Sequence, residues 1–433
     1  MAERLDQEIN EQALLVHGKR KGKIEIIGKV AIKDSKDLAL YYTPGVGAVS
    51  KAISENEDLS YEYTSRANTV VIISDGTRVL EMGHLGPEAE MPILEGKSLL
   101  FKKFGGVDAM PIVVSSKDKD DIIKFAKMIK PSVAAIAIED IESPKVFYIT
   151  RKLSEEIGLP VFHDDREGTS MVVRAALINS LKVIGKDPKK IKVVINGAGA
   201  AGHGISEILS DSGIKQIIVC DKKGAIYKGR EQDMGQFKNE IANRTNPSMM
   251  KGALDDMVKG ADVLIGVSAK GLFNKELIHS MARDPIVFAL ANPSPEIEYE
   301  EALAAGAAIV ATGRSDRPNQ VNNYIAFPGF FRGLLSCRAS KITKSMIMAG
   351  SDAIASSINK KELSKDHIIP KYDRQKDYIN LAYRVAISVS EAAVKEGVAQ
   401  LNLSRNEMKA EVRKMLIHYN KIEKQVEKLN KKA

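Results

Sequence analysis

Two acidic pairs follow two apolar runs of the sequence. Glu139 and Asp140 come directly after VAAIAI, and Asp164 and Asp165 come directly after PVFH. If the runs are neighbouring parallel strands, all four carboxylates gather at one sheet edge, because the carboxyl ends of parallel strands lie together. Mg²⁺ or Mn²⁺ prefers such oxygen ligands and would neutralise their repulsion. The alternative, equally compatible with the spacing, is that the acids cap helices on adjacent loops.

A glycine-rich loop supplies a second candidate site. In VVINGAGAAG, Gly197, Gly199 and Gly202 form GxGxxG between an apolar run and a helix-like run. Such glycines let the backbone turn tightly and approach a pyrophosphate at the start of a helix. The next apolar run ends in Asp221, 19 residues after Gly202, where the acid that binds an adenosine ribose is expected. The pattern predicts a dinucleotide site, and the other interpretation is turn glycines and a helix cap.

Asp221 also bears on the choice of dinucleotide. A carboxylate at this place favours NAD because it repels a ribose phosphate. Lys222 and Lys223 follow immediately and can pair with that phosphate. We therefore expect NAD and leave NADP open.

Two series of short apolar runs must position these residues. The first alternates with helix-like segments at 117–130 and 145–157, which predicts an α/β layer with parallel strands. Its runs lie at 69–74, 111–115, 133–138 and 160–163. A long apolar-rich helix from Gly168 leads to the second series, which predicts a Rossmann-type, doubly wound parallel sheet. Its runs lie at 192–196, 216–220, 262–267, 286–290 and 308–311.

The domain organisation follows from these series. A chain of 433 residues is too long for one ordinary core. We expect an N-terminal domain for substrate and metal at 1–165 and a dinucleotide-binding domain at 166–385. A C-terminal helical tail should occupy 386–433, because the pattern becomes helical after Lys341 and ends in a lysine-rich segment.

Composition narrows the class of protein. The net charge of +8 suits small anions such as dicarboxylates and dinucleotides, although a bland basic surface has the same charge. The basic run at 17–23 (HGKRKGK) has no interleaved aromatic residue, which favours a solvated loop over a nucleic-acid site. Two cysteines and a start without a signal pattern predict a cytoplasmic protein. No apolar run is long enough to predict a membrane span.

The chain resembles the malic enzyme family, specifically its shorter bacterial and archaeal branch. Eight stretches carry the resemblance, in the family's order. They are ALYYTPGVG (39–47), GPEAEMPILEGKSLLFKKFGGVDAMPI (86–112), AIAIEDIESP (135–144), VFHDDREGTSMV (161–172), VVINGAGAAG (193–202), CDKKGAIYKGR (220–230), IVFALANPSPEI (286–297) and ATGRSDRPNQVNNYIAFPG (311–329). Any one of them could arise by chance, but eight in series are highly specific.

The resemblance implies an enzyme that oxidises and decarboxylates malate to pyruvate, using NAD or NADP and Mg²⁺ or Mn²⁺. It also implies a homodimer that binds neither nucleic acid nor membrane. Glu139, Asp140 and Asp165 match the metal ligands, and Asp164 stands beside them as a catalytic candidate. The remaining matches have these implied roles: Tyr42 as general acid, Lys97 as general base, Ala200 and Ala201 with the three glycines at the cofactor, Asn292 at cofactor and substrate, and Asn322 and Arg78 at the substrate.

The chain departs from the family's pattern in two places. Glu81, His84 and Glu90 stand where we expect Gly, Asn or Asp, and Gly, which casts doubt on the substrate contacts near Arg78. The family's DIQGT or DQHGT appears here as DREGT. Neither departure touches the expected metal ligands.

The implied residues suffice for the reaction. Lys97, if its pKa is depressed, removes the hydroxyl proton of malate as hydride leaves for the nicotinamide, and Tyr42 protonates the enolate that remains after CO₂ departs. Three other functions use many of the same residues. They are a malolactic-type lyase that forms lactate, an oxaloacetate decarboxylase and a weakly catalytic dinucleotide-binding sensor.

Overall fold

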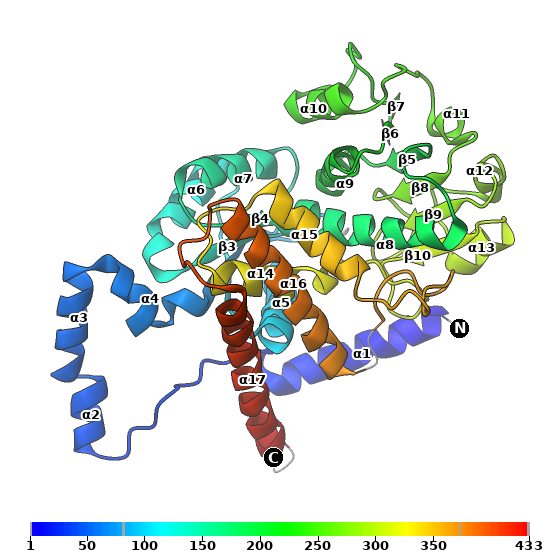
Figure 1. The fold of residues 1–433 in the computed structure, drawn as a ribbon. Helices are drawn as coiled ribbons and strands as arrows, with labels where there is room; N and C mark the ends of the chain where they lie inside the picture. The colour runs from blue at the N-terminus through cyan, green and yellow to red at the C-terminus, as the bar shows by residue number, and fades with distance from the viewer. Residues whose placement is uncertain (1, 80–82, 372–373, 431–433) are drawn as a thin grey trace.

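Two parallel β-sheets lie side by side in the computed structural model, which describes residues 2–79, 83–371 and 374–430. The chain completes the first sheet before it enters the second, and its last helices pack back onto the first (Figure 1). The α/β architecture expected from the sequence is confirmed. Among the described residues, no helix has both the length and the apolar character needed to cross a membrane.

The first sheet has the strand order β2-β1-β3-β4, and all its pairs are parallel. Its strands are β1 (Thr69–Ser74), β2 (Asp108–Val113), β3 (Ala135–Ile138) and β4 (Val161–His163). Three begin and end within two residues of the apolar runs, whereas β2 begins three residues earlier than its run and contains Pro111. A proline is tolerated there because β2 is an edge strand.

Helices precede this sheet and cover its two faces. Alternate residues of β1 point to opposite faces, so Val70 and Ile72 pack with α5 while Val71 and Ile73 pack with α6 and α7. The helices are α1 (Ala2–Arg20), α2 (Ser35–Tyr41), α3 (Gly45–Glu55), η1 (Glu57–Leu59), α4 (Ser60–Tyr63), η2 (Ser65–Asn68), α5 (Pro87–Gly105), α6 (Lys119–Met128), η3 (Lys130–Ser132) and α7 (Lys145–Glu156). The basic run expected to form a loop at 17–23 begins as the last turn of α1.

The second sheet is the expected doubly wound sheet, with the strand order β10-β9-β8-β5-β6-β7. All its pairs are parallel except that of β6 with the two-residue β7. Its strands are β5 (Lys192–Asn196), β6 (Gln216–Asp221), β7 (Gly224–Ala225), β8 (Val263–Gly266), β9 (Ile286–Ala289) and β10 (Ile309–Thr312). The connections leave β5 toward β6 on one side and return to β8 on the other, which creates a crevice at the carboxyl end of β5.

The remaining helices join the two sheets into one body. They are η4 (Asp164–Gly168), α8 (Thr169–Ile184), α9 (Ala200–Asp211), α10 (Gln236–Arg244), α11 (Leu254–Val258), α12 (Lys275–His279), α13 (Tyr299–Ala304), η5 (Asn323–Ile325), α14 (Phe327–Ser336), α15 (Lys344–Ala355), α16 (Gln375–Lys395) and α17 (Arg405–Asn430). One continuous apolar core runs from Val70 of β1 through Met171 of α8 and Phe330 of α14 to Val193 of β5. The carboxyl ends of both sheets are thereby held in fixed relation.

Candidate active site

The two acidic pairs lie together at one edge of the first sheet. Ile138 at the end of β3 pairs with His163 at the end of β4, so Glu139 and Asp164 follow at equivalent positions. Glu139, Asp140 and Asp164 are buried, and Asp165 is partly buried. One oxygen each of Glu139, Asp140 and Asp165 lies within 4.8 Å of an oxygen of the other two. The expected convergence of carboxylates at this edge is confirmed, and the three could surround one cation.

Lys97, a residue of helix α5, extends its side chain to this cluster. Its Nζ donates to Oδ2 of Asp164 and forms an ion pair with Oε1 of Glu139. Burial by itself lowers the pKa of Lys97, but the charges of Asp164 and Glu139 outweigh that effect and raise the pKa above its usual value. The depressed pKa that the sequence-based mechanism required is therefore absent in this geometry, and Lys97 is the protonated counterion of the acids.

Glu90 adds a fifth carboxyl to this cluster. It lies on α5 seven residues before Lys97, hence on the same face, and its side chain is fully buried. Burial, followed by the nearby negative charge of Asp140, raises the pKa of Glu90 to about 9. The sequence identified Glu90 only as a departure from the family's pattern, although its helical spacing from Lys97 predicts this place.

The donor set fits a divalent cation. Within the described residues, Oδ1 of Asp164 and Oδ2 of Asp165 are buried and accept no hydrogen bond. Burial raises the pKa of Glu139 and of Asp164 despite the opposing charge of Lys97. Burial also tends to raise the pKa of Asp165, but His163, whose Nε2 lies 3.8 Å from Oδ2 of Asp165, lowers it below its usual range. A buried group of hard oxygen donors with excess negative charge is what Mg²⁺ or Mn²⁺ requires.

Arg78 lies between the acidic cluster and the glycine loop. Its backbone N donates to the carbonyl oxygen of Asp140 at 3.1 Å, and its charge acts on Asp165. Its Nη1 lies 3.9 Å from the position that a Cβ of Gly199 would take. His84 lies in the same segment, with Nε2 2.8 Å from Nζ of Lys117. Glu81 lies outside the described residues.

The glycine loop occupies the crevice at the carboxyl end of β5. Gly197 has a φ of 126°, and a Cβ there would lie 2.6 Å from the carbonyl oxygen of Val267 after β8. A Cβ at Gly202 would collide with the carbonyl oxygen of Gly197. Gly199 precedes α9, whose first residues are Ala200 and Ala201. The loop is therefore closely packed and presents the start of a helix to the crevice, as dinucleotide binding requires.

The two asparagines expected at the substrate lie in loops: Asn292 follows β9 of the second sheet, and Asn322 precedes the short helix η5. Asn292 follows β9, and its Oδ1 lies 2.5 Å from the position of a Cβ on Gly313 after β10. Asn322 caps η5 by accepting a hydrogen bond from the backbone N of Tyr324 at 3.2 Å. Its neighbour Asn323 packs with its Cβ 3.2 Å from the position of a Cβ on Gly168, in the turn that carries Asp164 and Asp165. Asn323 was not among the residues expected from the sequence, although it directly follows Asn322.

Tyr42 is not part of this assembly. It is the C-cap residue that follows α2, and 66% of its surface is exposed. Every residue of α2 and α3 is described and none is buried. Both helices stand away from the sheets at the left of Figure 1.

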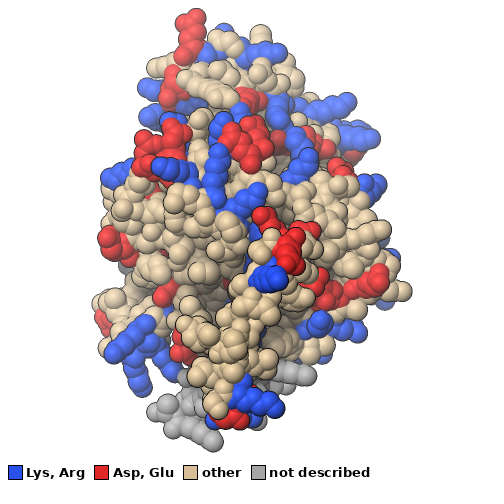
Figure 2. Space-filling view, turned by 90° about the vertical axis from the view of Figure 1, so that its left-hand side faces the viewer, with Lys and Arg blue, Asp and Glu red and all other residues tan. Residues whose placement is uncertain are grey.

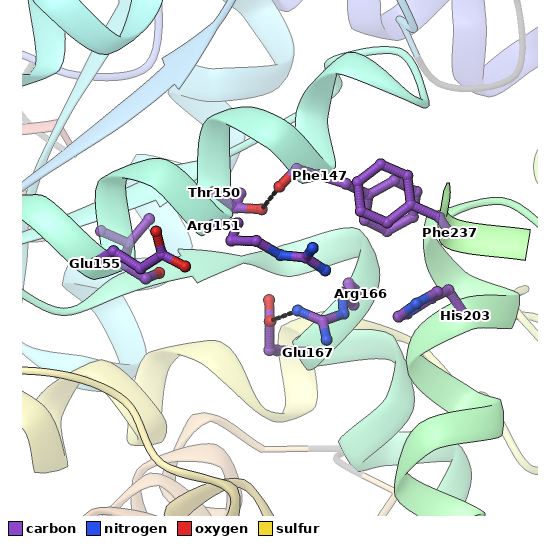
Figure 3. Close-up of a pocket in the computed structure, with 10 residues that line it drawn as sticks. Phe147, Thr150, Arg151, Glu155, Arg166, Glu167, His203 and Phe237 are labelled. Atoms are coloured by element: carbon purple, nitrogen blue, oxygen red, sulfur yellow. Dashed lines mark hydrogen bonds and ion pairs between the residues drawn. The ribbon is translucent and has the colours of Figure 1, made fainter. Parts of the chain in front are cut away.

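A separate cavity of about 210 Å³ lies behind the turn η4, between the two sheets' helices. The rings of Phe147 on α7 and Phe237 on α10 stack at 4.3 Å on one side of it, with His203 and Arg166 on the other (Figure 3). Arg166 pairs with Glu207 on α9. These contacts fix η4, and with it Asp164 and Asp165, against the second sheet, and they explain why the DREGT departure leaves the acidic cluster intact.

Comparisons with known proteins agree with this geometry. Residues 21–121 match the family model described as malic enzyme, N-terminal domain, and residues 167–394 match the malic enzyme NAD-binding domain. A bifunctional malic/malolactic enzyme of Bacillus subtilis (strain 168) is 46% identical over 94% of this chain and 99% of its own. An NAD-dependent malic enzyme of Geobacillus stearothermophilus is 46% identical over 90% of this chain and 80% of its own.

Solved structures give the same result. The crystal structure of the malic enzyme from Pyrococcus horikoshii Ot3 superposes with a TM-score of 0.89 at 40% identity, and it covers 97% of this chain and 98% of its own. Both halves of the chain therefore match one family, in sequence and in fold. The chain belongs to the malic enzyme family.

Proposed function

We propose that this chain oxidises and decarboxylates malate to pyruvate and CO₂, reducing NAD or NADP in a reaction that depends on a divalent metal. The observation that carries the proposal is the placement of Arg78 between the carboxylate cluster and the glycine loop. A small dicarboxylate bound there contacts an arginine, faces Lys97 and lies beside the entrance of the dinucleotide crevice. Metal, base, anion-binding group and dinucleotide are the components that this reaction needs.

Glu139, Asp140 and Asp165 are the residues that would hold the metal, because one oxygen of each converges on a common point, and Oδ2 of Asp165 is buried without a hydrogen bond. A divalent cation bound to them would offset their charge and polarise the hydroxyl and carbonyl oxygens of the substrate. Asp164 remains paired with Lys97 and positions its ammonium group. Gly197, Gly199, Ala200, Ala201, Gly202 and Asn292 would hold the dinucleotide, which accepts the hydride from malate.

Lys97 and Tyr42 divide the proton transfers. Lys97 receives the hydroxyl proton of malate, for which it must first lose the proton that the carboxylates hold on it in this geometry. Tyr42 donates its phenolic proton to the carbon from which CO₂ has departed. Asn322 and Arg78 orient the substrate's carboxylates. Each role needs the side chain to contact the substrate, and Tyr42 does not reach the cluster within its own chain.

A homodimer supplies the missing contact. We propose that the N-terminal arm, defined as residues 24–56, packs on a second copy and delivers Tyr42 to that copy's cluster. No residue of the arm, all of which is described, is buried. The arm exposes these apolar side chains: Ile24, Ile26, Ile27, Val30, Ile32, Leu38, Leu40, Tyr41, Tyr42, Val46 and Val49.

The exposed area supports this assembly. The chain exposes 21903 Å², whereas a compact monomer of 47.3 kDa should expose about 16,000 Å². The excess, about 5,900 Å² on one chain, is more than one subunit buries in an obligate homodimer interface, which totals roughly 2,000 to 5,000 Å² over both subunits. Figure 2, which looks onto the side that carries α2 and α3, shows uncharged areas in the middle and lower parts of this face, interrupted by a charged cluster near the centre, whereas charged groups are densest toward the top.

One assay tests the reaction. The chain is incubated with malate, Mn²⁺ and either NAD or NADP, absorbance is followed at 340 nm, and pyruvate and lactate are quantified at the end. Reduced dinucleotide and pyruvate in equal amounts support the proposal. Lactate without net reduced dinucleotide would identify a malolactic-type lyase, the second activity in the name of the Bacillus subtilis relative. Decarboxylation of added oxaloacetate without oxidation of malate would identify a decarboxylase.

A further inference from the structure

The carboxylate of Asp221 is saturated by groups of its own chain. Its Oδ1 accepts from the backbone N of Lys223 at 2.9 Å and from Nη1 of Arg230 at 3.0 Å. Its Oδ2 accepts from Nη2 of Arg230 at 2.5 Å and from Nζ of Lys238 at 2.8 Å. A carboxylate offers about four lone-pair sites, and all four are used. A ribose hydroxyl can bond to Asp221 only if one of these donors leaves.

The ion pair of Arg230 with Asp221 is difficult to break, because the Arg230 side chain is buried and makes several other contacts. Its side chain is 5% exposed. Nη1 also faces the carbonyl oxygens of Gly224 and Ala225 at 3.3 Å, and Nε lies 3.2 Å from the sulfur of Met234. The bidentate pair with Asp221 is therefore part of the folded hairpin of β6 and β7.

The charge beside the end of β6 is positive despite Asp221. Lys238, at the start of α10, bridges Asp221 and Asp233, with Nζ to Oδ2 of Asp233 at 2.9 Å. Arg230 and Lys238 thus balance the two acids. Lys222 and Lys223 are exposed and add two further positive charges in the turn that follows β6. An anionic group meets a net attraction here, whereas a neutral hydroxyl meets an acceptor that is already occupied.

We propose, building on the dinucleotide site of the proposed function, that this corner binds the 2′-phosphate of NADP through Lys222 and Lys223. Asp221 serves as the anchor that holds Arg230 and Lys238, not as the acceptor of the ribose hydroxyls. The chain therefore prefers NADP to NAD. The acid at the end of the second strand, which by itself favours NAD, loses that effect because Arg230 and Lys238 neutralise it.

The test uses two fragments that differ only in the 2′-phosphate, adenosine 2′,5′-bisphosphate and 5′-AMP. Isothermal titration of the full chain gives a dissociation constant for each. The bisphosphate should bind at least about tenfold more tightly, which is the effect of one charge-assisted hydrogen bond. The combined variant Lys222→Met and Lys223→Met should bring the ratio of the two constants close to one. Its 5′-AMP affinity should stay within about threefold, because no 5′-AMP contact is removed.

Two further variants sharpen the result. Lys215→Met removes an exposed lysine at the opposite end of β6 and should leave the ratio unchanged. Arg230→Met releases two donors from Asp221, so the ratio of the two dissociation constants should shift toward 5′-AMP. If Arg230→Met fails to fold, as judged by circular dichroism, the double lysine variant carries the test.

The proposal is overturned if the unaltered chain binds 5′-AMP as tightly as the bisphosphate, or if the double lysine variant keeps the full ratio. Those outcomes leave the dinucleotide site and the malate reaction intact. Absence of binding by either fragment would overturn the dinucleotide site together with this proposal. The fragments contain no nicotinamide, so neither result depends on turnover.

Discussion

Mixed dimers show directly whether Tyr42 acts in its own chain or in a partner. One subunit carries Lys97→Ala and keeps Tyr42, and the other carries Tyr42→Phe and keeps Lys97. If Tyr42 completes the partner's site, one site of the mixed dimer combines an intact Lys97 with an intact Tyr42, and the other has lost both. If Tyr42 acts within its own chain, each site lacks one of the two residues.

The expected activity follows from counting sites. The mixed dimer should have about half the malate oxidation rate of the unaltered dimer, since one of its two sites is complete. Each homodimeric variant should be nearly inactive, because every one of its sites lacks the base or the acid. The two chains are co-expressed with different affinity tags, the mixed dimer is isolated through both tags, and its rate is measured at 340 nm with malate and Mn²⁺.

A matched control reverses the expectation. An unaltered subunit paired with a subunit carrying both substitutions should be nearly inactive, because the intact Lys97 meets the partner's Tyr42→Phe and the intact Tyr42 meets the partner's Lys97→Ala. If Tyr42 acted within its own chain, this control would instead keep half the activity and the first mixed dimer would have none. That pair of results would refute the exchange of arms, and a monomeric chain in sedimentation would refute it as well.

Three further outcomes follow from the site. Asp165→Ala should abolish turnover and weaken Mn²⁺ binding, followed by electron paramagnetic resonance, at least about tenfold, because an oxygen ligand is lost; full activity in a chelator would contradict this. Lys97→Ala should lose the reduction of oxaloacetate by reduced dinucleotide, whereas Tyr42→Phe should largely keep it, and equal losses would show that the two act as one unit. Burial and the charge of Arg166 lower the pKa of His203 to about 4. The unfolded chain then takes up a proton below about pH 6.5 that the folded chain refuses, so the free energy of unfolding should fall by up to about 3 kcal/mol as the pH drops from 6.5 to 4. His203→Gln should flatten this dependence in urea titrations, and an unchanged slope would contradict the assignment.

The strands of both sheets were predictable because parallel strands buried on both faces have continuous apolar sequences. Thr69–Ser74 and Lys192–Asn196 match their runs at both ends. The start of the edge strand β2 was missed because Asp108 is not typical of a strand, and the expected run therefore began only at Pro111. At an edge they are tolerated, since only one side of the strand must pair and one face stays near solvent. An edge position is a property of the assembled sheet and cannot be read along the chain.

The exposure of the arm was unpredictable for a related reason. GVGAVSKAISE, the sequence of α3, has the apolar spacing of an ordinary core helix, and α2 contains Leu38 and Leu40. An apolar helix face predicts that the face is buried, but it does not show whether it packs against its own chain or against a partner chain. Only the position of α2 and α3 away from both cores shows that their own chain leaves them uncovered.

The pairings that define the site join elements far apart in sequence, and this decides which of them could be foreseen. The carboxylates were predictable because each follows an apolar run, and the topology of parallel strands brings such positions together. No such rule places Arg230 and Lys238, so their ion pairs with Asp221 are evident only from the structure. Glu90 lies between these cases. A charged residue on a helix usually faces solvent, but once Lys97 is assigned to the site, a residue two turns earlier must share its face. The location of Glu90 at the site was therefore predictable from the sequence once Lys97 had been assigned, because the helical spacing places both residues on one face of α5.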